Sequence, residues 1–289
     1  MTCLEETLML GASQHLVSTF VTPLQLPAGG PPVVALLTNS GVIPRSGPNR
    51  MNVHLSRQFA AMGIPSVRFD LSGLGDSGRP SQAKPMMAQW VADCQAVMDH
   101  AQQRHGCAHF LMVGFCSGAE VAHLLALEDR RMRAALLWDM YAYPTPASRL
   151  RFQLFRLQRL GLSGLARKLG ARLMRIVRPA HIPAKAARPA AIPASPPSKA
   201  ELVSRLNTLA AQGVVLHFSF GEGNPHWFNH ERQFWDMFKG EPFLQHVSFR
   251  FLKESDHLMT AGNAQAAFLA MTSEWVQGRV LPKLASARP

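Results

Sequence analysis

The sequence lacks any long hydrophobic run. No stretch of about 18 consecutive apolar residues occurs in the 289 residues, so we expect no membrane-spanning helix. The first residues carry Glu5 and Glu6, where a secretory signal would need basic residues followed by an apolar segment. These two absences predict a cytoplasmic protein.

Cysteine is scarce, and its spacing is uninformative for metals. The four cysteines are Cys3, Cys94, Cys107 and Cys116, and none forms a closely spaced pair of the kind that binds zinc. We therefore expect reduced thiols, no structural disulfide, no metal site and no cofactor.

Acidic residues are absent from 141–200, although twelve basic residues lie there. The other eighteen of the thirty Lys and Arg residues balance the eighteen Asp and Glu residues, so this segment carries the whole net charge of +12. Such a distribution predicts a local basic surface with an anionic partner, and no nucleic-acid partner. The alternative is a solvated basic lid that binds nothing.

Apolar strand-like segments alternate with helical ones along the rest of the chain. This alternation predicts an α/β fold with a mostly parallel sheet flanked by helices, preceded by an antiparallel hairpin in the first 25 residues. Residues 1–140 and 201–289 form the predicted core, and 141–200 form a basic cap insertion. The predicted strands are 33–38, 66–70, 108–114, 134–139, 214–220 and 246–252, and the predicted helices are 51–62, 85–104, 117–127 and 262–277.

The residues Gly114-Phe115-Cys116-Ser117-Gly118 lie between a predicted strand and a predicted helix. A nucleophile at such a strained turn needs small residues two positions before and two after it. Cys116 has glycine at both positions, whereas Ser117 would have Phe115 at one of them. We therefore predict that Cys116 is the nucleophile, with its thiolate favoured by the positive end of the following helix.

Two further segments predict the rest of the oxyanion site and a substrate contact. The N–H of Ser117 and a backbone N–H at Asn39 or Ser40, after the strand 33–38, would bind the oxyanion. Arg45 and Arg50 would either bind an anionic substrate or serve only to cap and pack.

The predicted general base is His257, which follows the last predicted strand. Three residues could orient it. Asp139 follows the strand 134–139, while Glu222 and Asn224 lie in the loop after the strand 214–220. We favour Asp139, and Asn224 stays open because asparagine orients the histidine in some cysteine proteases.

Together with the turn Asp70-Leu71-Ser72-Gly73-Leu74-Gly75-Asp76-Ser77, these motifs resemble the α/β-hydrolase superfamily over about 33–140 and 214–277. The cysteine elbow, the segment 47–50 and the segment 139–145 are similar to hydrolases associated with bacterial exosortase gene clusters, which are serine-aminopeptidase-like. Dienelactone hydrolases, which also use a cysteine elbow, are a weaker likeness. The resemblance implies an α/β-hydrolase fold, and a structural role for the turn at 70–77. Asn224 departs from the aspartate usual in that superfamily.

These observations predict an acyl-processing enzyme, a thioesterase or acyltransferase that works through a thioester on Cys116. Its substrate would be an acyl thioester, carried by coenzyme A or by an acidic acyl carrier protein. The alternatives are a carboxylester or lactone hydrolase of the dienelactone-hydrolase type, and a hydrolase-fold binding protein without catalysis.

Overall fold

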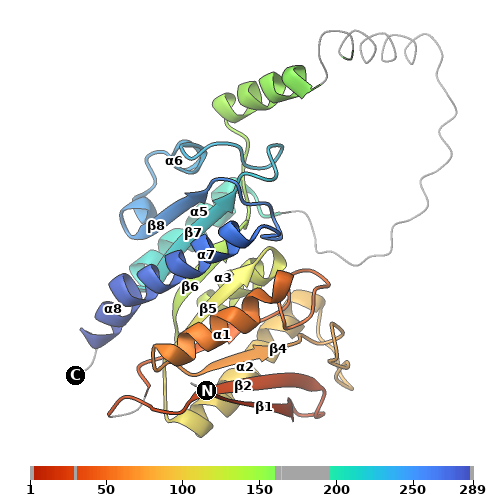
Figure 1. Ribbon diagram of the computed structural model, residues 1–289, viewed down its shortest axis with the longest axis vertical. Coiled ribbons are helices and arrows are strands. Elements are labelled where there is room, and N and C mark those ends of the chain that lie inside the picture. Colours follow the sequence, from red (N-terminus) through yellow and green to blue (C-terminus); the bar gives the residue numbers. More distant parts are fainter. Residues whose placement is uncertain (1–2, 29–30, 160–163, 165–195, 287–289) are drawn as a thin grey trace, which may run out of the picture.

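The computed structural model describes residues 3–28, 31–159, 164 and 196–286. Eight strands form one sheet in the order β1-β2-β4-β3-β5-β6-β7-β8, with helices on both faces (Figure 1). The strands are β1 (Cys3–Leu10), β2 (Leu16–Pro23), β3 (Val34–Leu37), β4 (Ser66–Phe69), β5 (Phe110–Phe115), β6 (Met132–Trp138), β7 (Val215–Gly221) and β8 (Val247–Leu252).

The sheet is antiparallel at one edge and parallel elsewhere. β1 pairs with β2, and β2 with β4, in antiparallel register. All pairs from β4 to β8 are parallel. The predicted edge hairpin and the mostly parallel sheet are therefore confirmed, and the carboxyl ends of the parallel strands meet at one edge of the sheet.

Two helical layers cover the sheet, and each has its own hydrophobic core. α1 (Met51–Ala61), α7 (Gly262–Trp275) and α8 (Leu281–Ala285) pack on one face, while α2 (Met86–His105), α3 (Ser117–Glu128) and α5 (Lys199–Ala211) pack on the other. Side chains of β5 alternate between the two cores, because successive residues of a strand point to opposite faces. The short elements are η1 (Pro48–Arg50), α6 (Gln233–Met237), η2 (Pro242–Gln245) and the π-helix η3 (Val276–Val280).

The sequence missed α5 and α6. α5 begins at the capping residue Ser198, whose Oγ accepts a hydrogen bond from the N–H of Glu201. It begins directly after the basic and proline-rich segment, at the predicted boundary between cap and core. None of the helices in the described parts of the chain is long and apolar enough to cross a membrane.

The predicted cap is only partly described. Residues 146–159 form a helix beyond the carboxyl end of β6, and Figure 1 shows it extending away from the sheet. Residues 160–163 and 165–195, with seven of the twelve basic residues, lie outside the described residues. The predicted boundaries of the cap, 141 and 200, therefore stay a prediction.

Candidate active site

Cys116 stands at a strained turn between β5 and α3. Its φ and ψ are 53° and −116°, a conformation that side chains rarely adopt and that functional sites often contain. The N–H of Cys116 donates to the carbonyl of Trp138 at 2.9 Å, which ties the turn to the neighbouring strand β6. The side chain is half-buried, and α3 begins at the next residue.

The two flanking glycines are required by close packing at this turn. A Cβ on Gly114 would lie 2.4 Å from the carbonyl oxygen of Gly118. A Cβ on Gly118 would lie 2.7 Å from the carbonyl oxygen of Asn39. Both distances are too short for real atoms, so the turn around Cys116 has room only for glycine at 114 and 118.

His257 and Asp139 lie together at the carboxyl edge of the sheet. His257 Nδ1 is 2.7 Å from a carboxylate oxygen of Asp139, whose side chain is 7% exposed. The other carboxylate oxygen accepts from the N–H of Gly221 at 3.1 Å. Asp139 itself has a φ of 48°, and its N–H donates to the carbonyl of Ser219, so two strands hold the carboxylate in place.

Charge around His257 favours its protonated form. The hydrogen bond to Asp139, followed by one to the Cys116 side chain, raises the pKa of His257 to about 10, against a lowering by partial burial. Because Asp139 occupies Nδ1, Nε2 is the nitrogen left for the sulfur. The structure therefore brings together the three residues predicted as Cys116, His257 and Asp139.

The two alternatives for orienting His257 lie elsewhere in the described structure. The Glu222 carboxylate accepts from the backbone N–H of Glu254 at 3.2 Å. Asn224 is exposed, and its carbonyl accepts from the N–H groups of Trp227 and Phe228. The loop that usually supplies the acid serves here as a turn, and Asp139 occupies the position against the histidine.

The predicted oxyanion loop packs directly on the elbow. Gly41 N–H donates to Ser117 Oγ at 2.8 Å, which joins the loop to the first turn of α3. The Asn39 side chain is buried and bonded to Asp70, Ile43 and Leu71, so only its backbone could face a substrate. The N–H of Ser117, in the first turn of α3, has no partner within the helix.

Arg45, one of the two arginines predicted either to bind a substrate anion or to cap and pack, forms ion pairs with two carboxylates. Its guanidinium lies 2.6 Å from Asp70 and 2.6 Å from Asp76, so two carboxylates already neutralise its charge. These contacts tie the loop to the turn at 70–77 and fit the alternative in which Arg45 serves only to cap and pack, while the substrate role of Arg45 stays a prediction. Arg50 is exposed, and no described residue forms a hydrogen bond or ion pair with its side chain.

Sequence reasoning missed two residues that hold the His257 loop. Trp138 Nε1 donates to the carbonyl of His257 at 3.2 Å, and Asn49 Nδ2 donates to the carbonyl of Leu258 at 2.9 Å. Asn49 adopts a φ of 48° just before α1. The positions of both side chains depend on contacts between distant segments, so no local pattern could have identified them.

A groove of about 610 Å³ lies beside the His257 loop. One wall is the helix 146–159, and the other is the segment 222–229. A Cβ on Gly223 would lie 2.4 Å from Cα of Asp256, so this wall rests on the residue before His257. The lining residues are Arg151, Phe152, Leu154, Phe155, Gln158, Arg159, Glu222, Gly223, Pro225 and Asn229.

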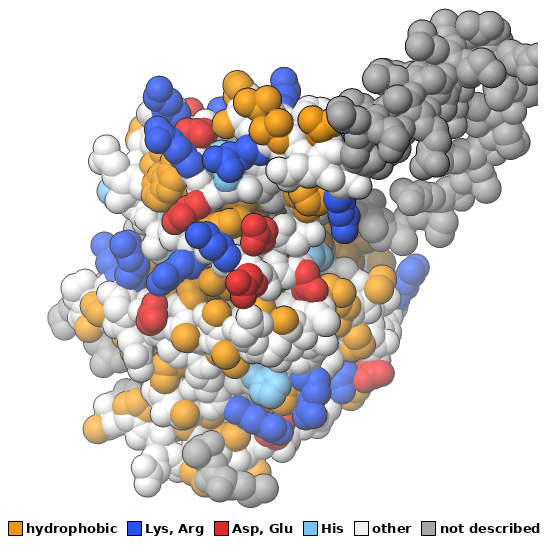
Figure 2. Space-filling view, turned by 45° about the horizontal axis from the view of Figure 1, so that its top comes forward, with side chains coloured by type: hydrophobic (Ala, Val, Ile, Leu, Met, Phe, Trp, Pro, Cys, Tyr) orange, Lys and Arg blue, Asp and Glu red, His pale blue; other side chains and the backbone are white. Residues whose placement is uncertain are grey.

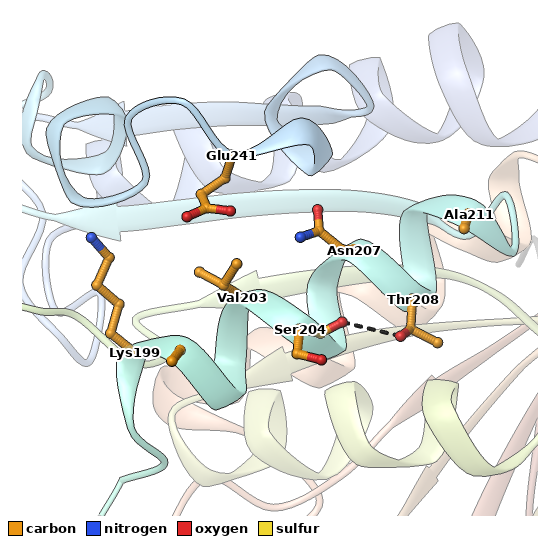
Figure 3. Close-up of a pocket in the computed structure, with 8 residues that line it drawn as sticks. Lys199, Val203, Ser204, Asn207, Thr208, Ala211 and Glu241 are labelled. Carbon is orange, nitrogen blue, oxygen red and sulfur yellow. Dashed lines mark hydrogen bonds between the residues drawn. The ribbon is translucent and has the colours of Figure 1, made fainter.

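A larger cavity, of about 880 Å³, lies along α5 and contains none of the predicted site residues. Figure 3 shows Lys199, Asn207 and Thr208 on one side of this hollow and Glu241 on the other. The only interaction drawn there is a hydrogen bond within α5, between Thr208 and the carbonyl of Ser204. We therefore place the candidate active site at Cys116, and not in the cavity along α5. No group of three or more metal-ligating side chains occurs among the described residues.

Comparison with known proteins supports this architecture. Residues 49–180 match the family model of serine aminopeptidase, S33, which is less than half of the chain. No curated protein matches the chain significantly.

Solved structures match over nearly the whole chain but at low identity. A serine hydrolase without a lid from Xanthomonas campestris has a TM-score of 0.54 and 13% identity, covering 96% of this chain and 94% of its own. A Klebsiella pneumoniae protein described as a dienelactone hydrolase has a TM-score of 0.57 and 14% identity, and the match covers 95% of this chain and 98% of its own. An esterase of Pyrococcus furiosus has a TM-score of 0.57 and 12% identity, and the match covers 95% of this chain and 90% of its own. The chain has the α/β-hydrolase fold.

Proposed function

We propose that this chain is an acyl-processing enzyme, a thioesterase or acyltransferase, that works through a covalent thioester on Cys116. The observation that carries the proposal is a thiol at the strained turn of a hydrolase fold, facing a histidine that Asp139 holds at 2.7 Å. Neighbours such as the Xanthomonas protein are named serine hydrolases. Here the hydroxyl of Ser117 is bonded to Gly41, and the sulfur is the group against His257.

The first half of the proposed reaction is the acylation of Cys116, which uses the thiolate of Cys116 and the proton of His257. The Cys116 sulfur adds to the acyl carbonyl, and the oxyanion that forms accepts from the N–H of Ser117 and from one at Asn39 or Ser40. When the tetrahedral intermediate collapses, the bond to the leaving group breaks, and the imidazolium of His257 gives its proton to the departing thiol or alcohol.

The second half needs His257 as a base, and the acylation step itself prepares it. Once the sulfur carries the acyl group it is no longer an anion, so one of the causes that raise the pKa of His257 is removed. The neutral imidazole then takes a proton from water, an alcohol or an amine, which attacks the thioester carbonyl. The proton stays on His257, because Cys116 departs as a thiolate, which forms an ion pair with the imidazolium.

A thioester donor fits this site better than a simple ester, because exchange between two thioesters is nearly balanced in energy. The groove beside His257 offers two arginines, Arg151 and Arg159, together with the aromatic side chains Phe152 and Phe155. Arginines over an apolar floor suit a phosphate-bearing acyl carrier. We therefore propose that the donor is an acyl thioester of the phosphopantetheine class, free as coenzyme A or attached to an acidic protein.

Intact-mass spectrometry after exposure to an acyl-coenzyme A tests the cysteine step. We expect one acyl adduct per chain, which is lost in Cys116→Ala and retained in Cys3→Ala. Cys3 is the matched control because it is also a half-buried free thiol. Turnover of simple esters with no adduct from the thioester would refute the proposal.

Salt dependence tests the groove. Thioester turnover should fall steeply between low and physiological salt, because the contact is electrostatic. Arg151→Gln with Arg159→Gln should raise KM and flatten this response. Arg232→Gln is the control, since its side chain is 83% exposed and lies outside the groove. An unchanged salt response in the groove variant would exclude an anionic donor there.

A carboxylester or lactone hydrolase is the second candidate, favoured by the likeness to the Klebsiella protein described as a dienelactone hydrolase. In that case Cys116 would still be acylated, but lactones and simple esters would be turned over faster than thioesters, and the groove variant would behave as the native protein. A chain with no adduct and no turnover would be a binding protein.

A further inference from the structure

The helix 146–159 carries an exposed apolar stripe, and one of its leucines, Leu154, lies at the edge of the groove. Leu150, Leu154 and Leu157 are 62%, 50% and 36% exposed, and their spacing places them on one face of a helix. The opposite face is the one that packs. Ser148 is buried there, and the Phe152 ring lies 4.9 Å from that of His226.

Arginines flank the stripe on both sides. Arg149 and Arg156 precede it around the helix, and Arg151 and Arg159 lie toward the groove. No described residue forms an ion pair with any of the four, and the helix contains no acid. Figure 2 shows basic and hydrophobic side chains next to one another at the upper end of that view. This pattern is typical of a helix that lies in the surface of an anionic membrane.

Three partners could cover the stripe, namely the following segment of this chain, a second copy of the protein or a lipid surface, and their charges differ. The chain that follows, 160–195, contains seven basic residues and no acid, so its sequence offers no negative charge to complement the arginines of this helix. A second copy would bring the same positive face to a symmetric contact. An anionic lipid surface accepts leucines and arginines together, because acyl chains take the former and headgroup phosphates the latter.

We propose that the helix 146–159 binds the protein to anionic membrane surfaces, with Leu150, Leu154 and Leu157 inserted among the acyl chains. The same helix forms one wall of the groove beside His257, so binding would place that groove next to the bilayer. This inference does not rest on the proposed chemistry, because it uses neither Cys116 nor His257.

Flotation of the full chain with vesicles tests the proposal. We expect binding to vesicles of equal parts phosphatidylglycerol and phosphatidylcholine, and little binding to phosphatidylcholine alone. Leu150→Gln with Leu157→Gln should weaken binding by about tenfold. Leu24→Gln with Leu26→Gln is the matched control, since these leucines are 63% and 44% exposed, and it should change binding less than about twofold.

Two further variants separate charge and chemistry from lipid contact. Arg149→Gln with Arg156→Gln, which lie outside the groove lining, should weaken binding by about tenfold at low salt. Cys116→Ala should bind vesicles as the native chain does, so a failure of the proposed enzyme function would leave this result unchanged.

Three outcomes would overturn the inference. The native chain could fail to float with anionic vesicles. The leucine pair could bind as the native chain does, which would place any lipid contact elsewhere. Gel filtration could show that the native chain is a dimer and that the double leucine variant is a monomer. It could also show that this variant no longer binds an acidic acyl carrier protein, while the native chain binds no vesicles. In either case the stripe would be a protein interface.

Discussion

Replacing Asp139 by asparagine should lower the pKa of His257 more than any other single change at the site. Asparagine keeps the shape and can still accept from the N–H of Gly221, but it removes the negative charge 2.7 Å from Nδ1. The hydrogen bond to Asp139 is the largest cause of the raised pKa, and Cys116 is the next favourable one. We therefore expect a larger decrease in Asp139→Asn than in Cys116→Ala.

The rise from the ordinary value of 6.5 to about 10 sets the magnitude. An adjacent opposite charge changes a pKa by about 1 to 3, so we expect a decrease of about 2 in Asp139→Asn and about 1 in Cys116→Ala. A decrease of 2 corresponds to roughly 3 kcal/mol. Because the His257 side chain is 39% exposed, solvent screening reduces its effect on unfolding to roughly 1–2 kcal/mol.

The stability effect has a defined pH range. A histidine whose pKa is raised on folding adds stability that is complete below pH 6.5 and is lost as the pH rises through about 10. The difference in unfolding free energy between native and Asp139→Asn should therefore be nearly constant below about pH 8, the value expected for His257 in the variant, and should shrink between about pH 8 and pH 10.

Two measurements check this prediction. Titration of the His257 ring nitrogens by ¹⁵N NMR gives the pKa in each variant, and urea denaturation at several pH values gives the unfolding free energies. A His257 that titrates near 6.5 in the native chain would refute the reasoning. So would a larger decrease in Cys116→Ala than in Asp139→Asn.

Three other changes have expected outcomes. Gly118→Ala should destabilise the fold by about 2 kcal/mol in thermal unfolding because its Cβ meets backbone, whereas Gly262→Ala, with open space around it, should not; equal effects would contradict the packing argument. Arg45→Gln should lower the free energy of unfolding, measured by urea denaturation, by about 2–4 kcal/mol, because it leaves the buried carboxylate of Asp70 unpaired. Arg50→Gln should leave this free energy unchanged. A raised KM in Arg45→Gln without lost stability would favour the substrate role instead. Burial lowers the pKa of His123 to about 4, so His123→Leu should gain about 2 kcal/mol in relative stability between pH 7 and pH 4.5, and a pH-independent difference would oppose this.

Local signals in the sequence were enough to predict the core of the fold. Apolar strands alternate with amphipathic helices over most of the chain, and the predicted segments agree with the observed elements to within a few residues. The elbow was also visible, because its two glycines have a steric cause that acts within five residues. α5 was missed because the composition around it is irregular, and a helix that packs on a sheet needs only a weak pattern of its own.

The turn at Cys116 could be predicted from the sequence alone, since glycine stands two residues before and two residues after it, where a Cβ would collide with backbone. The partner of His257 was decided only by tertiary structure. Asp139, Glu222 and Asn224 all follow neighbouring parallel strands, so each can reach the same edge of the sheet. The choice depends on a distance of 2.7 Å between residues 118 positions apart. The contacts of Arg45 likewise depend on tertiary structure, because the turn at 70–77 brings two carboxylates against it.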